Sequence, residues 1–151
     1  MSITITVHGQ DGSRLDVHVI RYERPEATDE ADANWLVARI EVTTGSFSGT
    51  VEGSLTTQDF QEFRGQLVKA LDVGDGVAEF RTLEDILEVK VTINRRGQAN
   101  VSGRLRSLDR PSTELSFASK AISRSSNALY STSTRSLTRF LCDQDHERPD
   151  R

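Results

Sequence analysis

ILEVKVTINRRGQANVSGRL, residues 86–105, is the stretch that decides the fold class. Apolar and polar side chains alternate along both of its halves, and a period of two is typical of strands with one buried face. Residues 94–97 (NRRG) lie between the halves and predict a hairpin turn. The stretch therefore predicts two adjacent antiparallel strands.

The same alternation extends in both directions from this hairpin. It covers residues 3–7, 15–19, 35–42, 47–55 and 77–82, and it returns at residues 115–117. We expect about eight antiparallel strands in a curved sheet or β-sandwich, because strands of this kind bury their apolar faces against a second layer. The apolar parity changes at Ile20 and Tyr22, which predicts a β-bulge or the end of strand pairing. Gly49 and Gly53 interrupt an apolar face, which predicts close packing or strong coiling there.

One segment, residues 56–72, breaks the alternation and predicts a helix. Thr56 is a suitable N-cap, and Asp59 completes the spacing of a capping box. A glycine-rich stretch, residues 74–76, ends the pattern. The predicted fold is thus mainly β (α+β), with one amphipathic helix covering an open sheet face. Its apolar stripe, at spacings of three and four, is Phe60, Phe63, Leu67 and Leu71.

The 151 residues suffice for one domain, and charge is divided unevenly along them. Residues 1–90 contain 17 acidic and 8 basic side chains, whereas residues 91–151 contain 6 and 11. The net charge of −4 and the lack of a basic face with aromatic residues argue against nucleic-acid binding. No apolar run approaches the roughly 20 residues that span a bilayer, and no secretory signal precedes the first strand. We therefore expect a cytoplasmic protein without membrane contact.

Residues that often carry catalysis or bind metals are scattered along the chain. The histidines His8, His18 and His146 fall in no metal-binding or catalytic motif, and a single cysteine, Cys142, excludes a disulfide framework. We expect no enzyme activity, no bound metal and no cofactor. The oligomeric state stays open between a monomer and a homodimer.

The most acidic part of the chain is residues 23–34, ERPEATDEADAN, between two predicted strands. A loop of this charge suits a basic partner surface, and ordinary solvated surface is the alternative interpretation. Trp35, directly after the loop, is expected in the core or at its boundary. The candidate partner-binding residues are Glu23, Glu26, Asp29, Glu30 and Asp32.

The residues around this loop carry a family resemblance. Tyr22 and Pro25 precede an acidic run that ends in the block DANWLV (residues 32–37), followed by IEV (residues 40–42). This arrangement resembles the WapI-like immunity family of bacterial toxin–immunity systems. The similarity continues through residues 45–49, 59–71, 78–84 and 97–103, and so covers about residues 15–117.

The resemblance implies a small, cytoplasmic, β-rich protein that neutralises a cognate toxin by binding it, and a nuclease toxin would suit an acidic inhibitor. It supplies no catalytic residues. The alternative is a small structural or ligand-binding β-sandwich domain.

Residues 118–151 depart from both the alternation and the resemblance. Serine and threonine make up 11 of the 23 residues from 116 to 138, where the resemblance implies a turn and an acidic, leucine-rich helix. We expect one domain over residues 1–117 and a poorly ordered or weakly helical tail over residues 118–151. Our hypothesis is a frameshift in the gene. Codons that are allowed for this amino-acid sequence can be read in another frame, from the third base of the Phe117 codon onward. That frame can encode the turn and helix that the resemblance implies. A natural tail is the alternative, and the gene sequence decides between them.

Overall fold

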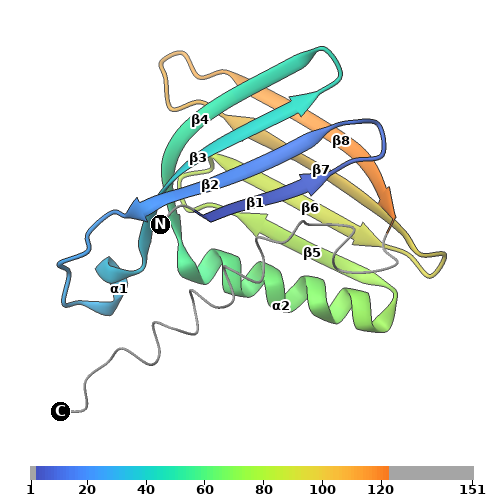
Figure 1. The fold of residues 1–151 in the computed structure, drawn as a ribbon, viewed down its shortest axis with the longest axis horizontal. Helices are drawn as coiled ribbons and strands as arrows, with labels where there is room; N and C mark the ends of the chain where they lie inside the picture. Colours follow the sequence, from blue (N-terminus) through green and yellow to red (C-terminus); the bar gives the residue numbers. More distant parts are fainter. Residues whose placement is uncertain (1–2, 123–151) are drawn as a thin grey trace.

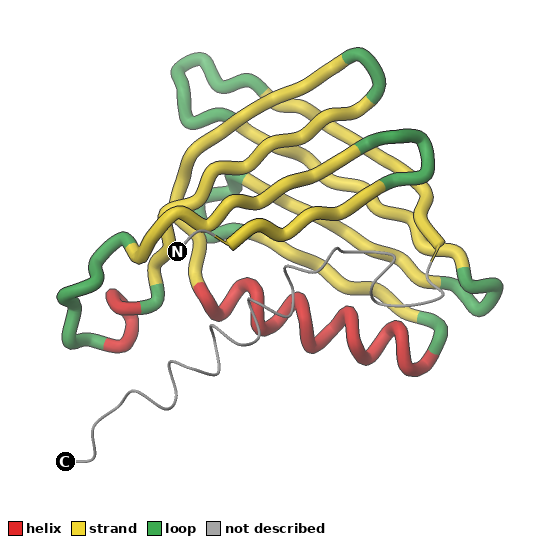
Figure 2. Tube along the Cα trace, viewed as in Figure 1, coloured by secondary structure: helices red, strands yellow, loops and turns green. Residues whose placement is uncertain are grey.

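The computed structural model describes residues 3–122, which form eight strands and two helices (Figures 1 and 2). Sheet A contains β1 (Ile3–His8), β2 (Arg14–Tyr22), β3 (Trp35–Thr44) and β4 (Phe47–Thr56). Sheet B contains β5 (Gly76–Arg81), β6 (Leu87–Ile93), β7 (Gln98–Arg106) and β8 (Glu114–Ile122). Within each sheet, every strand pairs antiparallel with its neighbours in sequence, so each sheet is a four-stranded meander. The predicted β-sandwich with one long helix is confirmed.

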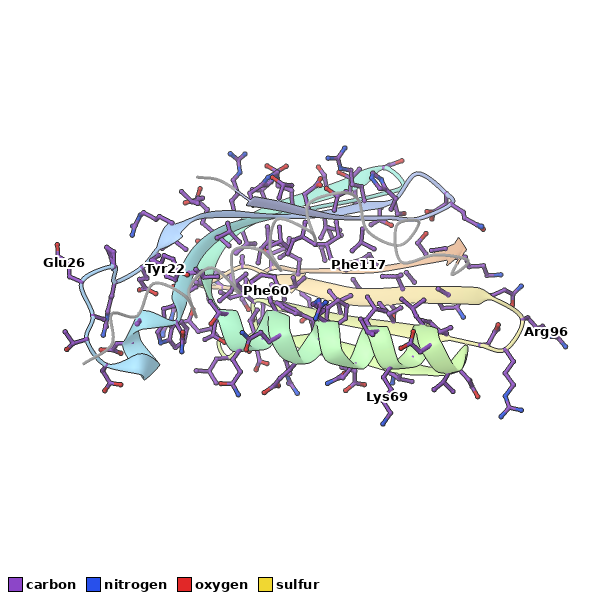
Figure 3. The ribbon with its side chains drawn as sticks, turned by 60° about the horizontal axis from the view of Figure 1, so that its bottom comes forward. Tyr22, Glu26, Phe60, Lys69, Arg96 and Phe117 are labelled. Atoms are coloured by element: carbon purple, nitrogen blue, oxygen red, sulfur yellow. The ribbon has the colours of Figure 1, made fainter. Side chains whose placement is uncertain are left out.

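The core lies between the two sheets, which form separate layers in Figure 3. In sheet A the odd-numbered apolar residues of β2 and the even-numbered ones of β3 point inward and are buried, while the residues between them face outward. Sheet B repeats this pattern, and the hairpin of β6 and β7 pairs Val91 with Val101. The side chains with no exposed surface include Leu36 and Ile40 of sheet A, Ala99 of sheet B, and Ile86 directly before β6. The alternation in the sequence therefore gives each sheet one apolar face, and the two apolar faces pack against each other.

Helix α2 (Thr57–Val73) joins the two sheets and packs on β5. Its capping box is formed as predicted: the Thr56 hydroxyl accepts a hydrogen bond from the Asp59 backbone at 3.2 Å, and the Asp59 carboxylate accepts one from the Thr56 backbone at 2.9 Å. Gly74 ends the helix at a φ of 72°, a left-handed conformation that glycine adopts easily. Phe60 and Phe80 have ring centroids 5.2 Å apart, so the helix is anchored on the inner face of sheet B.

Two local predictions are confirmed. The register of β2 against β3 shifts between Val19 and Arg21 and pairing continues to Tyr22, so the parity change marks a bulge and not the end of pairing. A Cβ atom built on Gly53 would lie 2.2 Å from Ile86 Cδ1, so the Ile86 side chain packs directly over this glycine. Neither described helix is long and apolar enough to cross a membrane.

The last strand is longer than predicted. β8 continues to Ile122, five residues beyond the domain boundary expected at residue 117, because Ala121 pairs with Ala99 and is buried. The remainder of the predicted tail, which contains most of the sequence concerned by the frameshift hypothesis, lies outside the described residues.

Candidate functional site

The acidic loop connects β2 to β3 and projects from one end of the sandwich, away from α2 and both sheets (Figure 1). It contains one feature that the sequence did not predict, the single-turn helix α1 (Glu30–Ala33). The Ala33 backbone donates to the Asp29 carbonyl oxygen at 2.9 Å and closes that turn. The five predicted residues thus share one connection on one side of the molecule.

Hydrogen bonds tie both ends of the loop to the body. The Glu23 backbone donates to the Trp35 carbonyl oxygen at 2.9 Å, and the Thr57 backbone at the start of α2 donates to the Asn34 carbonyl oxygen at 3.0 Å. Trp35 is half-buried, which confirms its expected place at the core boundary. Burial also raises the pKa of the Tyr22 hydroxyl at the base of the loop. The acidic loop therefore has a fixed base.

The acidic side chains differ in their surroundings. Glu23, Glu26 and Asp29 are exposed, and Glu26 lies at the outer end of the loop in Figure 3. Asp32 is half-buried and pairs with Arg24 across the loop, with an N–O distance of 2.7 Å. The side chain of Glu30 lies outside the described part of the chain. Within that part, no ion pair compensates the carboxylates of Glu23 and Glu26.

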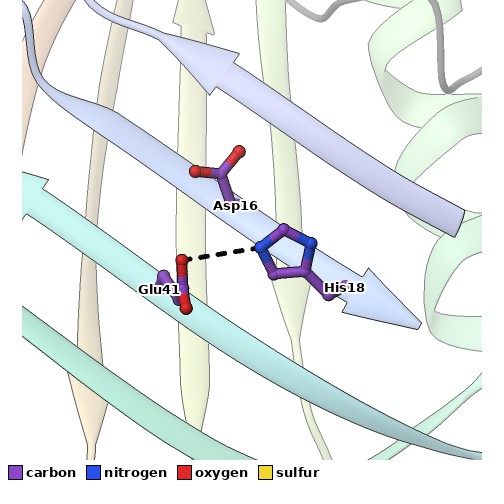
Figure 4. A group of neighbouring side chains, drawn as sticks. All are labelled: Asp16, His18 and Glu41. Carbon is purple, nitrogen blue, oxygen red and sulfur yellow. Dashed lines mark ion pairs between the residues drawn. The ribbon is translucent and has the colours of Figure 1, made fainter. Parts of the chain in front are cut away.

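A second polar group lies on the outer face of sheet A, and Figure 4 shows its three central side chains. Asp16 and His18 come from β2, and Glu41 is the direct cross-strand neighbour of Asp16 on β3. His18 Nε2 lies 3.5 Å from Glu41 Oε2, and His18 Nδ1 is hydrogen-bonded to the Thr4 hydroxyl at 2.9 Å. One imidazole and two carboxylates are donors that suit a divalent transition metal.

Arginine and threonine side chains surround this group. Thr6 donates to one oxygen of Asp16 and Arg14 to the other, each at 2.5 Å. The hydrogen bond to Asp16 raises the pKa of Arg14 above its ordinary value. The sequence places His18 on a polar strand face but gives no sign of Glu41 beside it. Their approach depends on the register between β2 and β3, which no motif encodes.

An apolar groove opens between β1 of sheet A and α2. Its lining comes from both sheets and the helix, with one cation, Arg64, and its residues include Ile5, Val7, Phe63, Leu67 and Phe80. β1 is the edge strand of sheet A, so the groove lies where sheet A ends.

Comparison with known proteins gives one match. The model of the immunity protein WapI-like family matches residues 5–144, which extends beyond the resemblance over residues 15–117 at both ends. No curated protein and no solved structure matches the chain.

Proposed function

This chain belongs to the WapI-like immunity protein family, and we propose on that basis that it binds a cognate bacterial toxin domain and blocks it by protein–protein contact. The family match is the observation that carries the proposal. The architecture supports it, since a rigid two-layer body with one anchored, projecting loop is a common way to present a binding surface. We further propose that this binding takes place in the cytoplasm and involves no catalysis by this chain.

We propose the acidic loop as the contact surface, through Glu23, Glu26, Asp29, Glu30 and Asp32. Its carboxylates would face a basic surface on the toxin, such as the phosphate-binding cleft of a nuclease. Complementary charge accelerates encounter and excludes partners of like charge. The Arg24–Asp32 ion pair restricts the loop before binding, which lowers the entropy lost when the complex forms.

The test is the association rate between this protein and the toxin domain encoded beside its gene, measured by stopped-flow fluorescence over a range of salt concentrations. The loop variant replaces Glu23→Gln, Glu26→Gln and Asp29→Asn. The control replaces three exposed acids elsewhere on the body, Asp72→Asn, Glu84→Gln and Asp109→Asn. Both variants change the net charge equally, so general charge effects cancel.

We expect the loop variant to associate at least about tenfold more slowly at low salt, with a flatter salt dependence, while the control keeps most of the original rate. If both variants associate at the same rate, the loop is not the contact surface. If the toxin does not bind the unmodified protein at all, the proposed function itself fails.

The apolar groove favours one other function, the binding of a small apolar molecule between the sheets. A lining of aliphatic and aromatic side chains with one cation at its edge suits a small apolar acid. A thermal-shift screen with such compounds would raise the unfolding temperature if the groove is a ligand site. Unchanged unfolding temperatures across the screen would leave toxin binding as the function.

A further inference from the structure

We propose that Asp16, His18 and Glu41 bind one divalent transition-metal ion on the outer face of sheet A. This proposal is independent of toxin binding and of the acidic loop. It rests on three observations: the three side chains bring their donor atoms together, neighbouring groups orient these donors, and the strand register places two carboxylates side by side.

The donor spacing is close to that of a metal site. One donor atom from each side chain lies within 4.8 Å of the other two, and His18 Nε2 is already 3.5 Å from Glu41 Oε2. Zinc is bound by nitrogen and oxygen at about 2.0–2.2 Å in tetrahedral geometry, which separates its ligands by roughly 3.3–3.6 Å. Metal binding would require the Asp16 carboxylate to turn toward the other two donors and to exchange its contact with Arg14 for the metal.

The His18 imidazole is oriented so that Nε2 can bind a metal. The Thr4 hydroxyl bonds His18 Nδ1 at 2.9 Å, which leaves Nε2 directed at the carboxylates (Figure 4). When Nδ1 donates its proton to Thr4, Nε2 carries the lone pair that a metal needs. Outer-shell partners of this kind set the tautomer and ring orientation of metal-binding histidines. The Thr6 hydroxyl fixes the Asp16 carboxylate in the same way.

Two carboxylates lie side by side at this place. Asp16 and Glu41 lie directly opposite each other on paired strands, and repulsion between two like charges in this position destabilises the sheet. The Asp16 side chain is only 9% exposed, so water screens it poorly. Arg14 and Arg39 each take one carboxylate oxygen, but both guanidinium-bearing side chains are half exposed. Arg39 pairs with Glu41 Oε1, which leaves Glu41 Oε2 facing His18.

The donor set selects the metal class. A nitrogen ligand with two carboxylates suits zinc and similar transition metals, whereas calcium and magnesium prefer oxygen donors alone. Three protein ligands leave one position for water. The competing arrangement is an ion-pair network that is complete without a metal, in which the two arginines alone neutralise the carboxylates.

Titration calorimetry with zinc chloride distinguishes the two arrangements. The full-length chain would carry Cys142→Ser and His146→Gln, so that these residues contribute no ligand. In this background we compare His18→Gln and Glu41→Gln with the control His8→Gln, which removes an exposed histidine from the end of β1 on the same face. Circular dichroism checks that each variant is folded.

We expect the background protein and the His8→Gln control to bind one zinc ion per chain. Binding should weaken at least about tenfold in His18→Gln and in Glu41→Gln. Anomalous diffraction at the zinc edge should place the ion between the three side chains. The absence of saturable zinc binding, or equal affinity in His18→Gln and the background protein, would overturn the proposal. If one variant fails to fold, the other gives the answer alone.

Discussion

Replacing Gly103 with alanine should disrupt sheet B, because the space above this residue is already filled. Gly103 lies on β7 between Val89 of β6 and Phe117 of β8. An added Cβ would lie 2.2 Å from the Glu88 carbonyl oxygen and 2.7 Å from the Phe117 ring, whereas real Cβ atoms essentially never approach within 3.0 Å. The ring can turn aside, but the carbonyl belongs to the β6 backbone and cannot move without disturbing the hydrogen bonds between strands.

Overpacking a core typically costs about 1–3 kcal/mol, and a fixed backbone atom places Gly103→Ala at or above the upper value. Gly65→Ala is the matched control, since it adds the same methyl group at an exposed position in α2 with no atom within 4 Å. Alanine is about 1 kcal/mol more favourable than glycine inside a helix, so the control should gain stability. The two variants should therefore differ by about 4 kcal/mol in unfolding free energy.

Urea denaturation followed by circular dichroism and by the fluorescence of the single tryptophan, Trp35, measures this difference. The account predicts a lower midpoint for Gly103→Ala and a higher midpoint for Gly65→Ala, relative to the unmodified chain. Equal midpoints for Gly103→Ala and the unmodified chain would refute the packing described between β6, β7 and β8.

Three further changes test other parts of the structure. Thr56→Ala removes one half of the α2 capping box and should lower the unfolding free energy by about 1 kcal/mol. An unchanged urea midpoint would show that the capping box does not stabilise the fold. Phe80→Ala removes the ring that contacts two aromatic residues of α2 and should cost about 3–5 kcal/mol by the same assay, whereas a loss below that of Thr56→Ala would show that α2 is anchored elsewhere. The Ser119 hydroxyl donates to Asp11 and lowers the pKa of that carboxyl, so this contact stabilises the fold above the ordinary pKa of 3.8 and is lost as the pH falls through the lowered value. Ser119→Ala should therefore lower the melting temperature at pH 6 and lower it less in strong acid, and an equal effect at both pH values would contradict the role of Asp11.

The elements with a strong local pattern could be predicted from the sequence. The hairpin of β6 and β7 follows from alternation and a four-residue turn, and α2 follows from its cap, stripe and terminal glycine. The bulge near Ile20 follows from one change of parity. In each case the physical cause acts between residues near in sequence, so the sequence pattern carries it.

Apart from α1, which one local hydrogen bond closes, the features that the sequence did not predict depend on contacts between distant residues. The alternation ends at residue 117, five residues before the end of β8, because the last part of this strand is held by pairing with β7 and by burial of Ala121 rather than by a strong apolar pattern. The proximity of His18 and Glu41 depends on strand register across a bulge. The five acidic loop residues were grouped correctly on one connection, but their role in binding stays a prediction.

The most direct test of the central claim is an inhibition titration of the cognate toxin domain with the purified full-length chain. The account predicts that toxin activity falls linearly and is abolished when one chain is present for each toxin molecule. Full toxin activity in the presence of excess chain would contradict it.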